Sequence, residues 1–194
     1  MKLKINQIIS NSFEDFVAWR KHIHANPELS FKEVKTAEFV ASQLREMGIP
    51  FSEGVAGTGI VALIKGVNPS KKCIALRADL DALPIQEEND VAYKSTVANV
   101  MHACGHDVHT TCLLGAAKVL NCLRADFEGT VKLIFQPGEE VLPGGASQMI
   151  AEGVLDKPKV DEIYALHVFP EMDAGKVGFK EGNYMAACDE LYLS

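Results

Sequence analysis

The chain has 194 residues, of which 47% are hydrophobic and 23% charged, proportions typical of one globular domain or a large part of one. Its 26 acidic residues outnumber its 19 basic residues, and the net charge of -7 disfavours nucleic acid or an anionic membrane as a partner. No apolar run reaches the roughly 18 residues of a membrane-spanning helix, and the N-terminus lacks the apolar stretch of a secretory signal. Five irregularly spaced cysteines are expected to be reduced thiols, so a cytoplasmic protein is expected.

The N-terminal residues predict two helices. Residues 12–25 show helical spacing of apolar positions and end at Asn26-Pro27, a dipeptide that breaks helices. Ser30 and Glu33 stand three residues apart, as in a capping box, in which the two side chains bind free backbone N–H groups at a helix start. They predict a second helix over residues 31–47.

Strands and helices are expected to alternate through the rest of the chain. Turn-like segments separate the apolar runs, and residues 85–100 read as a polar loop. The expected strands are 59–64, 73–78, 130–135, 162–166 and 175–182, and the expected helices are 107–123 and 146–151. This order predicts an α/β fold, with a mixed, mostly parallel sheet and helices on both faces.

The densest group of reactive side chains lies in residues 101–109, immediately before a predicted helix. A thiol beside imidazoles is typical of a transition-metal site or of a nucleophile with its base. Cys104 and His106, two residues apart in a loop, are candidate metal ligands. His102 and His109 are either hydrogen-bond partners of the ligands or surface residues, and the former is favoured for His109.

Three predicted strands end in polar side chains. Asp79 and Asp81 follow the second strand, Glu139 and Glu140 follow the third, and His167 follows the fourth. Ligands of open α/β sheets bind beyond the carboxyl ends of the strands, so one site can gather all of these groups. The mixture suits Zn²⁺ or another divalent transition metal rather than Mg²⁺ or Ca²⁺. The alternative reading is turn chemistry for the aspartates and a solvated turn for the glutamates.

With these residues, the chain resembles the metal-dependent amidohydrolases of the aminoacylase and carboxypeptidase superfamily. The resembling branch contains hippurate hydrolases, N-acetyl-diaminopimelate deacetylases and auxin-conjugate hydrolases. Five segments carry the resemblance in order, and they are residues 24–30, 76–85, 101–107, 135–140 and 165–168. The resemblance implies a zinc-peptidase-like catalytic domain. Residues 1–194 would be its N-terminal part, truncated before the lid and dimerisation domain and the C-terminal catalytic segment.

The resemblance also implies roles for the candidate residues. Two divalent metal ions (Zn, Mn, Co or Ni) are expected per full active site, held in this chain by Cys104, His106, Glu140 and His167, with Cys104 shared between them. Glu139 would be the general base. Three residues would hydrogen-bond behind the ligands, namely Asp79, Asp81 and His109. The last two expectations are a small-molecule N-acyl amino acid as substrate and a homodimer formed through the lid domain.

The implied reaction is hydrolysis of the amide bond of an N-acyl amino acid. Two alternatives stay open. The chain alone is a metal-binding fragment without activity, because the lid and a last histidine ligand lie outside it. Otherwise Cys104 is a nucleophile with His106 or His109 as its base, which predicts inactivation by iodoacetamide and indifference to chelators.

Overall fold

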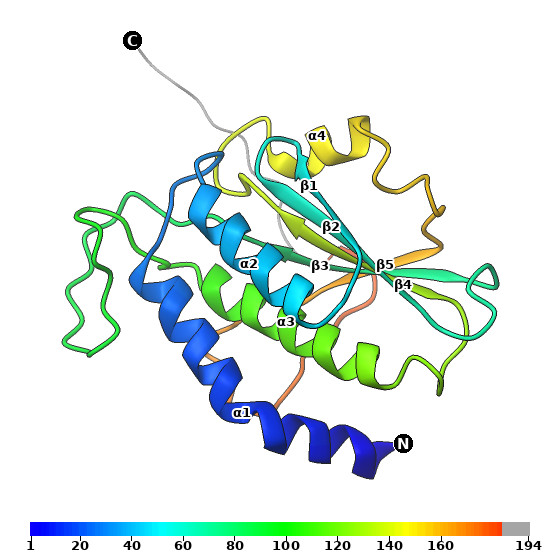
Figure 1. Ribbon diagram of the computed structural model, residues 1–194. Helices are drawn as coiled ribbons and strands as arrows, with labels where there is room; N and C mark the ends of the chain where they lie inside the picture. Colours follow the sequence, from blue (N-terminus) through cyan, green and yellow to red (C-terminus); the bar gives the residue numbers. More distant parts are fainter. Residues whose placement is uncertain (184–194) are drawn as a thin grey trace.

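The computed structural model describes residues 1–183, and its centre is one mixed sheet of five strands (Figure 1). The strands are β1 (Phe51–Val55), β2 (Gly59–Lys65), β3 (Cys73–Asp79), β4 (Thr130–Gln136) and β5 (Glu162–Ala165), in the order β1-β2-β4-β3-β5. β2 runs antiparallel to both β1 and β4, whereas β3 runs parallel to both β4 and β5. The carboxyl ends of β3, β4 and β5 therefore meet at one edge of the sheet.

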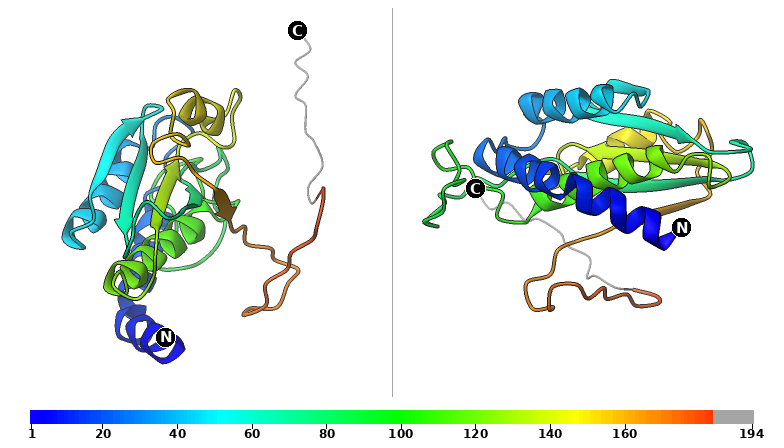
Figure 2. Two further views of the ribbon diagram at one scale, coloured as in Figure 1. Left: turned by 90° about the vertical axis from the view of Figure 1, so that its right-hand side faces the viewer. Right: turned by 60° about the horizontal axis from the view of Figure 1, so that its bottom comes forward.

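Helices lie on both faces of this sheet, as predicted (Figures 1 and 2). They are α1 (Lys2–Ala25), α2 (Val34–Glu46), α3 (His106–Cys122) and α4 (Gly145–Ala151). α2 and α3 pack on one face, α1 packs along α3, and α4 covers part of the opposite face. The α/β prediction is confirmed.

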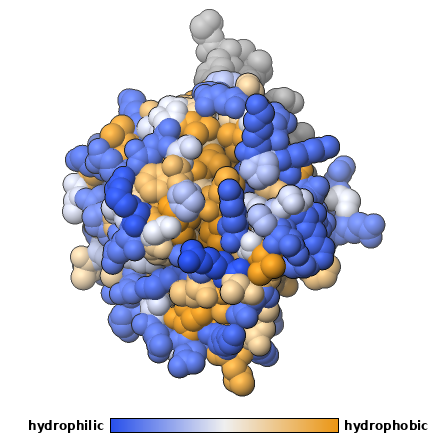
Figure 3. Space-filling model, turned by 45° about the vertical axis from the view of Figure 1, so that its right-hand side comes forward, coloured by the Kyte–Doolittle hydropathy of each residue, from blue (hydrophilic) through white to orange (hydrophobic). Residues whose placement is uncertain are grey.

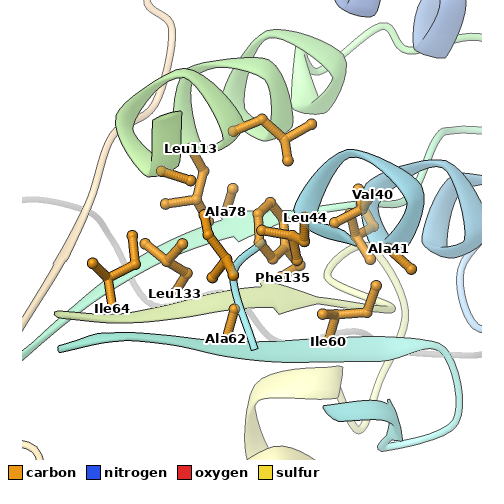
Figure 4. Packing of buried hydrophobic residues seen from close by; sticks show 14 residues of the cluster. Val40, Ala41, Leu44, Ile60, Ala62, Ile64, Ala78, Leu113, Leu133 and Phe135 are labelled. Atoms are coloured by element: carbon orange, nitrogen blue, oxygen red, sulfur yellow. The ribbon is translucent and has the colours of Figure 1, made fainter. Parts of the chain in front are cut away.

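The main hydrophobic core lies between the sheet and the helices α2 and α3 (Figure 4). Leu44 of α2, Leu114 of α3, and Leu133 and Phe135 of β4 have no exposed surface. Each side chain of this kind stabilises the fold by about 1.5–3 kcal/mol through burial. A smaller cluster under α4 includes Ile134, which points to the opposite face because side chains alternate along a strand. This packing fixes the strand ends and the start of α3.

The predicted capping box is wrong. α2 begins at Val34, and neither Ser30 nor Glu33 binds its free N–H groups. Glu28 caps the helix instead, because its carboxylate accepts the backbone N–H of Thr36 at 2.8 Å. The side chains of Ser30 and Glu33 find hydrogen-bond partners in other elements, which a local sequence pattern does not show.

Two further predictions differ from the structure. Residues 166–183 contain no strand, so the strand expected at 175–182 is wrong. Its apolar residues have no neighbouring strand within the described part of the chain, and Phe179 is 93% exposed. β1 was not predicted, because Ser52 and Glu53 are polar and exposed, and pairing with β2 holds them in the sheet. The prediction also missed the first turns of α1.

The surface combines hydrophilic side chains with apolar areas, as the face in Figure 3 shows. Within residues 1–183, large exposed apolar side chains recur after β5, where the chain leaves the sheet as a coil (Figure 2). They include Leu166, Phe169, Val177 and Phe179. None of the described helices is long and apolar enough to cross a membrane.

Candidate metal centre

Four segments bring reactive side chains to the edge at which the parallel strands end. Asp79 is the last residue of β3, and Glu139 and Glu140 follow β4 after a short turn. His167 follows β5, and His106 is the first residue of α3. The parallel register of β3 with β4 and β5 therefore gathers side chains that lie far apart in the sequence.

Gly105 allows the loop before α3 to approach the segment after β5. Its φ of +86° is left-handed, and a Cβ atom here would collide with the side chain of Val168. Any other residue would be strained in this conformation and would push the two segments apart. Glycine at this position thus brings Cys104 and His106 close to His167.

The first potential ligand group consists of Cys104, His106 and His167, whose ligand atoms all lie within 4.8 Å of one another. The Sγ atom of Cys104 is 3.5 Å from Nε2 of His167. The Nδ1 atom of His167 lies 2.7 Å from the carbonyl oxygen of Val168, to which a protonated Nδ1 donates. That tautomer leaves Nε2 with a lone pair directed toward the thiol.

The second potential ligand group consists of His106, Glu139 and Glu140. Nε2 of His106 lies 3.6 Å from Oε1 of Glu140 and 4.0 Å from Oε2 of Glu139. Among the described residues, neither this nitrogen nor Oε1 of Glu140 has a hydrogen-bond partner, although both atoms are buried. Leaving such atoms unpaired costs about 1–3 kcal/mol each, so a ligand that binds both would remove the cost. Sulfur, nitrogen and carboxylate donors in this arrangement fit a divalent transition metal.

Asp81 orients His106, which belongs to both of these groups, from behind. Its carbonyl oxygen and its Oδ1 lie 2.9 and 3.2 Å from Nδ1 of His106, so the Nδ1–H donates and Nε2 faces the cluster. Its Oδ2 accepts the backbone N–H of Glu140 at 2.9 Å and the hydroxyl of Ser30 at 2.6 Å. Burial would raise the pKa of Asp81, but these hydrogen bonds lower it to about 2. An ionised Asp81 in turn helps to raise the pKa of His106, against the effect of burial.

Asp79, His106 and His109 form a third potential ligand group, in which Asp79 and His109 are already hydrogen-bonded to each other. The Nδ1–H of His109 donates to Oδ1 of Asp79 at 2.7 Å, and Nε2 of His109 accepts the backbone N–H of Val168 at 2.9 Å. Both ring nitrogens of His109 are therefore occupied, which favours a supporting position over a metal ligand. Burial would raise the pKa of Asp79, but the His109 hydrogen bond and the Arg77 guanidinium outweigh burial and lower it.

Burial and the negative charges of the site raise the pKa values of both Cys104 and Glu139. Burial, together with the nearby carboxylates of Glu140, Glu139 and Asp79, raises the pKa of Cys104 to about 12. A thiol with this pKa is protonated at neutral pH and is a poor nucleophile, which counts against the cysteine-nucleophile alternative. Burial and the charge of Glu140 also raise the pKa of Glu139, whose side chain is 40% exposed.

The sequence patterns missed a buried network next to these potential ligands. His24 of α1 lies 2.7 Å from Oδ2 of Asp107 through Nδ1 and 3.1 Å from Oε1 of Glu87 through Nε2. The Asp107 hydrogen bond raises the pKa of His24, and Arg20 pairs with the same carboxylate. This network holds α1, the loop before residue 100 and the start of α3 together. His102, for which a surface position stayed open, is buried, and burial lowers its pKa to about 4.

A thiol, imidazoles and carboxylates that meet at the carboxyl edge of an α/β sheet define the class of metal-binding hydrolytic sites. Comparison with known proteins narrows this class. Residues 75–187 match the family described as Peptidase family M20/M25/M40, and the chain belongs to this family.

Individual relatives show the extent of the likeness. The chain is 43% identical over 192 residues to an N-acyl-L-amino acid amidohydrolase of Geobacillus stearothermophilus, covering 99% of the chain and 51% of that relative. It is 47% identical over 179 residues to the hippurate hydrolase of Campylobacter jejuni, covering 92% and 46%. The solved structure of the Bacillus subtilis YXEP protein, described as a dinuclear metal binding peptidase from the M20 family, superposes with a TM-score of 0.83 at 42% identity, covering 87% and 46%. The chain thus spans about half the length of these relatives.

Proposed function

We propose that the protein hydrolyses the amide bond of N-acyl amino acids, with two divalent metal ions bound in its active site. One observation carries the proposal, namely the convergence of Cys104, His106, Glu140 and His167. Within residues 1–183, Nε2 of His106 and Oε1 of Glu140 are buried there without a hydrogen-bond partner. The names of the amidohydrolase and hippurate hydrolase relatives support the substrate class. Residues 1–194 would form the N-terminal part of the catalytic domain. A lid that also dimerises the protein, and a further catalytic segment, would lie outside this chain.

Four residues would hold the metal ions (Zn, Mn, Co or Ni), with Cys104 shared between them, and they are Cys104, His106, Glu140 and His167. When bound, such ions supply Lewis acidity, which polarises a carbonyl group and brings the pKa of water to about 7. Asp81 and Asp79 hold the imidazoles of His106 and His109 in fixed orientations by hydrogen bonds.

Glu139 would be the general base. Its carboxylate is partly exposed, lies next to the ligands and has a raised pKa, as proton transfer near neutral pH requires. It would accept a proton from the attacking water and donate it to the leaving amide nitrogen. The amide bond then breaks, and a carboxylate and a free amino acid are released.

The proposal is tested by elemental analysis of the purified protein and of its Cys104→Ser variant, together with assays on hippurate and N-acetyl-methionine. Cys112→Ser is the matched control, because Cys112 is exposed on α3 outside the ligand groups. We expect bound metal and hydrolysis in the wild type and in the control, and loss of both in Cys104→Ser. Equal metal content in all three proteins would remove Cys104 from the ligands.

A second candidate function follows from the length of the chain. Since it spans about half of its relatives, the chain alone would bind metal without turnover. Bound metal without hydrolysis supports this alternative, whereas hydrolysis by the chain alone contradicts it.

The proposed cytoplasmic location rests on the four described cysteines, which are all free thiols.

A further inference from the structure

Glu33 is a completely buried carboxylate that has no part in the proposed chemistry. Its exposed fraction is 0%, and within residues 1–183 all of its side-chain hydrogen bonds come from neutral donors. Oε1 accepts the backbone N–H of Phe31 at 2.9 Å and that of Gly138 at 2.8 Å, and Oε2 accepts the hydroxyl of Thr58 at 2.6 Å. Removing a carboxylate from water costs free energy, so we expect the buried side chain of Glu33 to have a specific role.

A purely structural role would be to cap the helix that Glu33 precedes. Glu33 is the N-cap residue of α2, and its backbone oxygen accepts the N–H of Ala37. Its side chain, however, makes no capping hydrogen bond, and Glu28 binds the N–H of Thr36 in its place. The carboxylate of Glu33 is thus directed away from its own helix and toward the turn after β4.

The residues around Glu33 contact this turn at two further points. Gly138 has a φ of +55°, and a Cβ atom on it would collide with the ring of Phe31. Ser30 donates to Asp81, whose same oxygen accepts the N–H of Glu140. Residues 30–33 therefore restrain the backbone on both sides of Glu139.

We propose that Glu33 is a positioning residue for Glu139, acting through its hydrogen bond to the N–H of Gly138. This inference rests on the proposed function, in which Glu139 is the general base. The side chain of Glu33 hydrogen-bonds to Phe31, Thr58 and Gly138, and none of these belongs to the proposed ligands. It fixes the turn from which Glu139 projects, and a shift of about 1 Å in a reacting group can lower a rate about 100-fold.

The direct test is hydrogen exchange of the peptide that contains the Gly138 amide. In Glu33→Ala this N–H loses its acceptor inside the protein, so we expect exchange to become roughly 10-fold faster. The matched control is Glu28→Ala, which removes another carboxylate beside α2 without touching residues 138–140. The Gly138 amide should exchange at the wild-type rate in the control.

Kinetics with hippurate provide the second readout. We expect Glu33→Ala to lower kcat roughly 10- to 100-fold at nearly unchanged KM and metal content, since Glu33 contacts no ligand. Glu33→Gln should restore part of kcat, because its amide oxygen still accepts the N–H of Gly138. Glu28→Ala should keep the wild-type kcat.

Two results would overturn the role of Glu33, namely equal exchange at Gly138 in Glu33→Ala and Glu28→Ala, or equal losses of kcat in both. If Glu33→Ala does not fold, Glu33→Asp replaces it, because the shorter side chain keeps the charge but withdraws the carboxylate from Gly138. Wild-type exchange in Glu33→Asp would also refute the proposal. A wild-type protein without hydrolysis, in which Glu33 variants still alter exchange, would instead count against the proposed function alone.

Discussion

Replacing Asp81 by asparagine should show how much one buried carboxylate stabilises the candidate metal centre. Its side chain is completely buried, and its pKa is lowered from 3.8 to about 2. Burial opposes this change, but hydrogen bonds from His106, from the N–H of Glu140 and from Ser30 outweigh it. At about 1.36 kcal/mol for each pH unit, the lowered pKa corresponds to roughly 2.5 kcal/mol of stability at neutral pH.

The pH dependence identifies the ionised carboxylate as the source of this stability. A lowered carboxyl pKa stabilises the folded chain fully above the unfolded value of 3.8, and the effect is lost as the pH falls through about 2. About half of the contribution should be gone near pH 3. The pKa of His106 is raised above 6.5, so at pH 5 and below His106 is protonated in the folded and the unfolded wild-type chain and adds no slope.

The assay is urea unfolding of the metal-free chain at about pH 5, 4 and 3, followed by the fluorescence of its single tryptophan, Trp19. We expect the wild type to exceed Asp81→Asn in free energy of unfolding, by an amount that shrinks toward pH 3. Asp15→Asn is the control, because its 57% exposed carboxylate forms a surface ion pair with Lys118 that contributes little. A difference that is absent at pH 5, or that does not change with pH, would refute the reasoning.

Four further substitutions test other parts of the structure. Glu139→Gln should lower kcat about 10²- to 10⁴-fold with metal content unchanged, whereas Glu140→Gln should lose metal, and metal analysis alongside kinetics separates them. Leu114→Ala should lower the free energy of unfolding by about 2–5 kcal/mol, because it leaves a cavity in the main core, and a denaturant titration measures this loss. Gly105→Ala should weaken metal binding in a competition titration with a chelator, because its Cβ would displace Val168, and wild-type affinity would contradict the role of this glycine.

The sequence predicted the parts of the site that follow from local patterns. Apolar runs marked β3, β4 and β5, and polar residues directly after them marked the edge at which Asp79, Glu140 and His167 lie. Parallel pairing then brought these ends together, because an α/β sheet leaves little choice for strands that alternate with helices. The prediction that these strand ends meet did not require the order of the strands in the sheet.

Hydrogen-bond partners distant in the sequence were beyond prediction. Glu33 binds the N–H of Gly138 across 105 residues, and His24 binds Glu87 across 63. A capping pattern and helical spacing describe only the nearest turns of the chain, so they assigned Ser30 and Glu33 to the wrong partners. The resembling segment 24–30 did mark this region, but it did not show which atoms these residues contact.

The polar atoms of the site fall into two groups, one with hydrogen-bond partners and one without them among the described residues. Those behind the potential ligands, such as both carboxylate oxygens of Asp81, already have hydrogen-bond partners. Within the described part of the chain, Nε2 of His106 and Oε1 of Glu140, which face the cluster, have none.

This division has an energetic consequence. Side chains already fixed by their neighbours lose little conformational freedom when a cation binds, so more of the binding energy is retained as affinity. In addition, four carboxylates, those of Asp79, Asp81, Glu139 and Glu140, lie close around the imidazole of His106. Three of them, those of Asp79, Glu139 and Glu140, face Nε2 of His106, and a divalent cation bound there would reduce their mutual repulsion. The fold would therefore favour a cation at this site, because hydrogen bonds fix the imidazoles of His106 and His167 and carboxylates concentrate negative charge beside them.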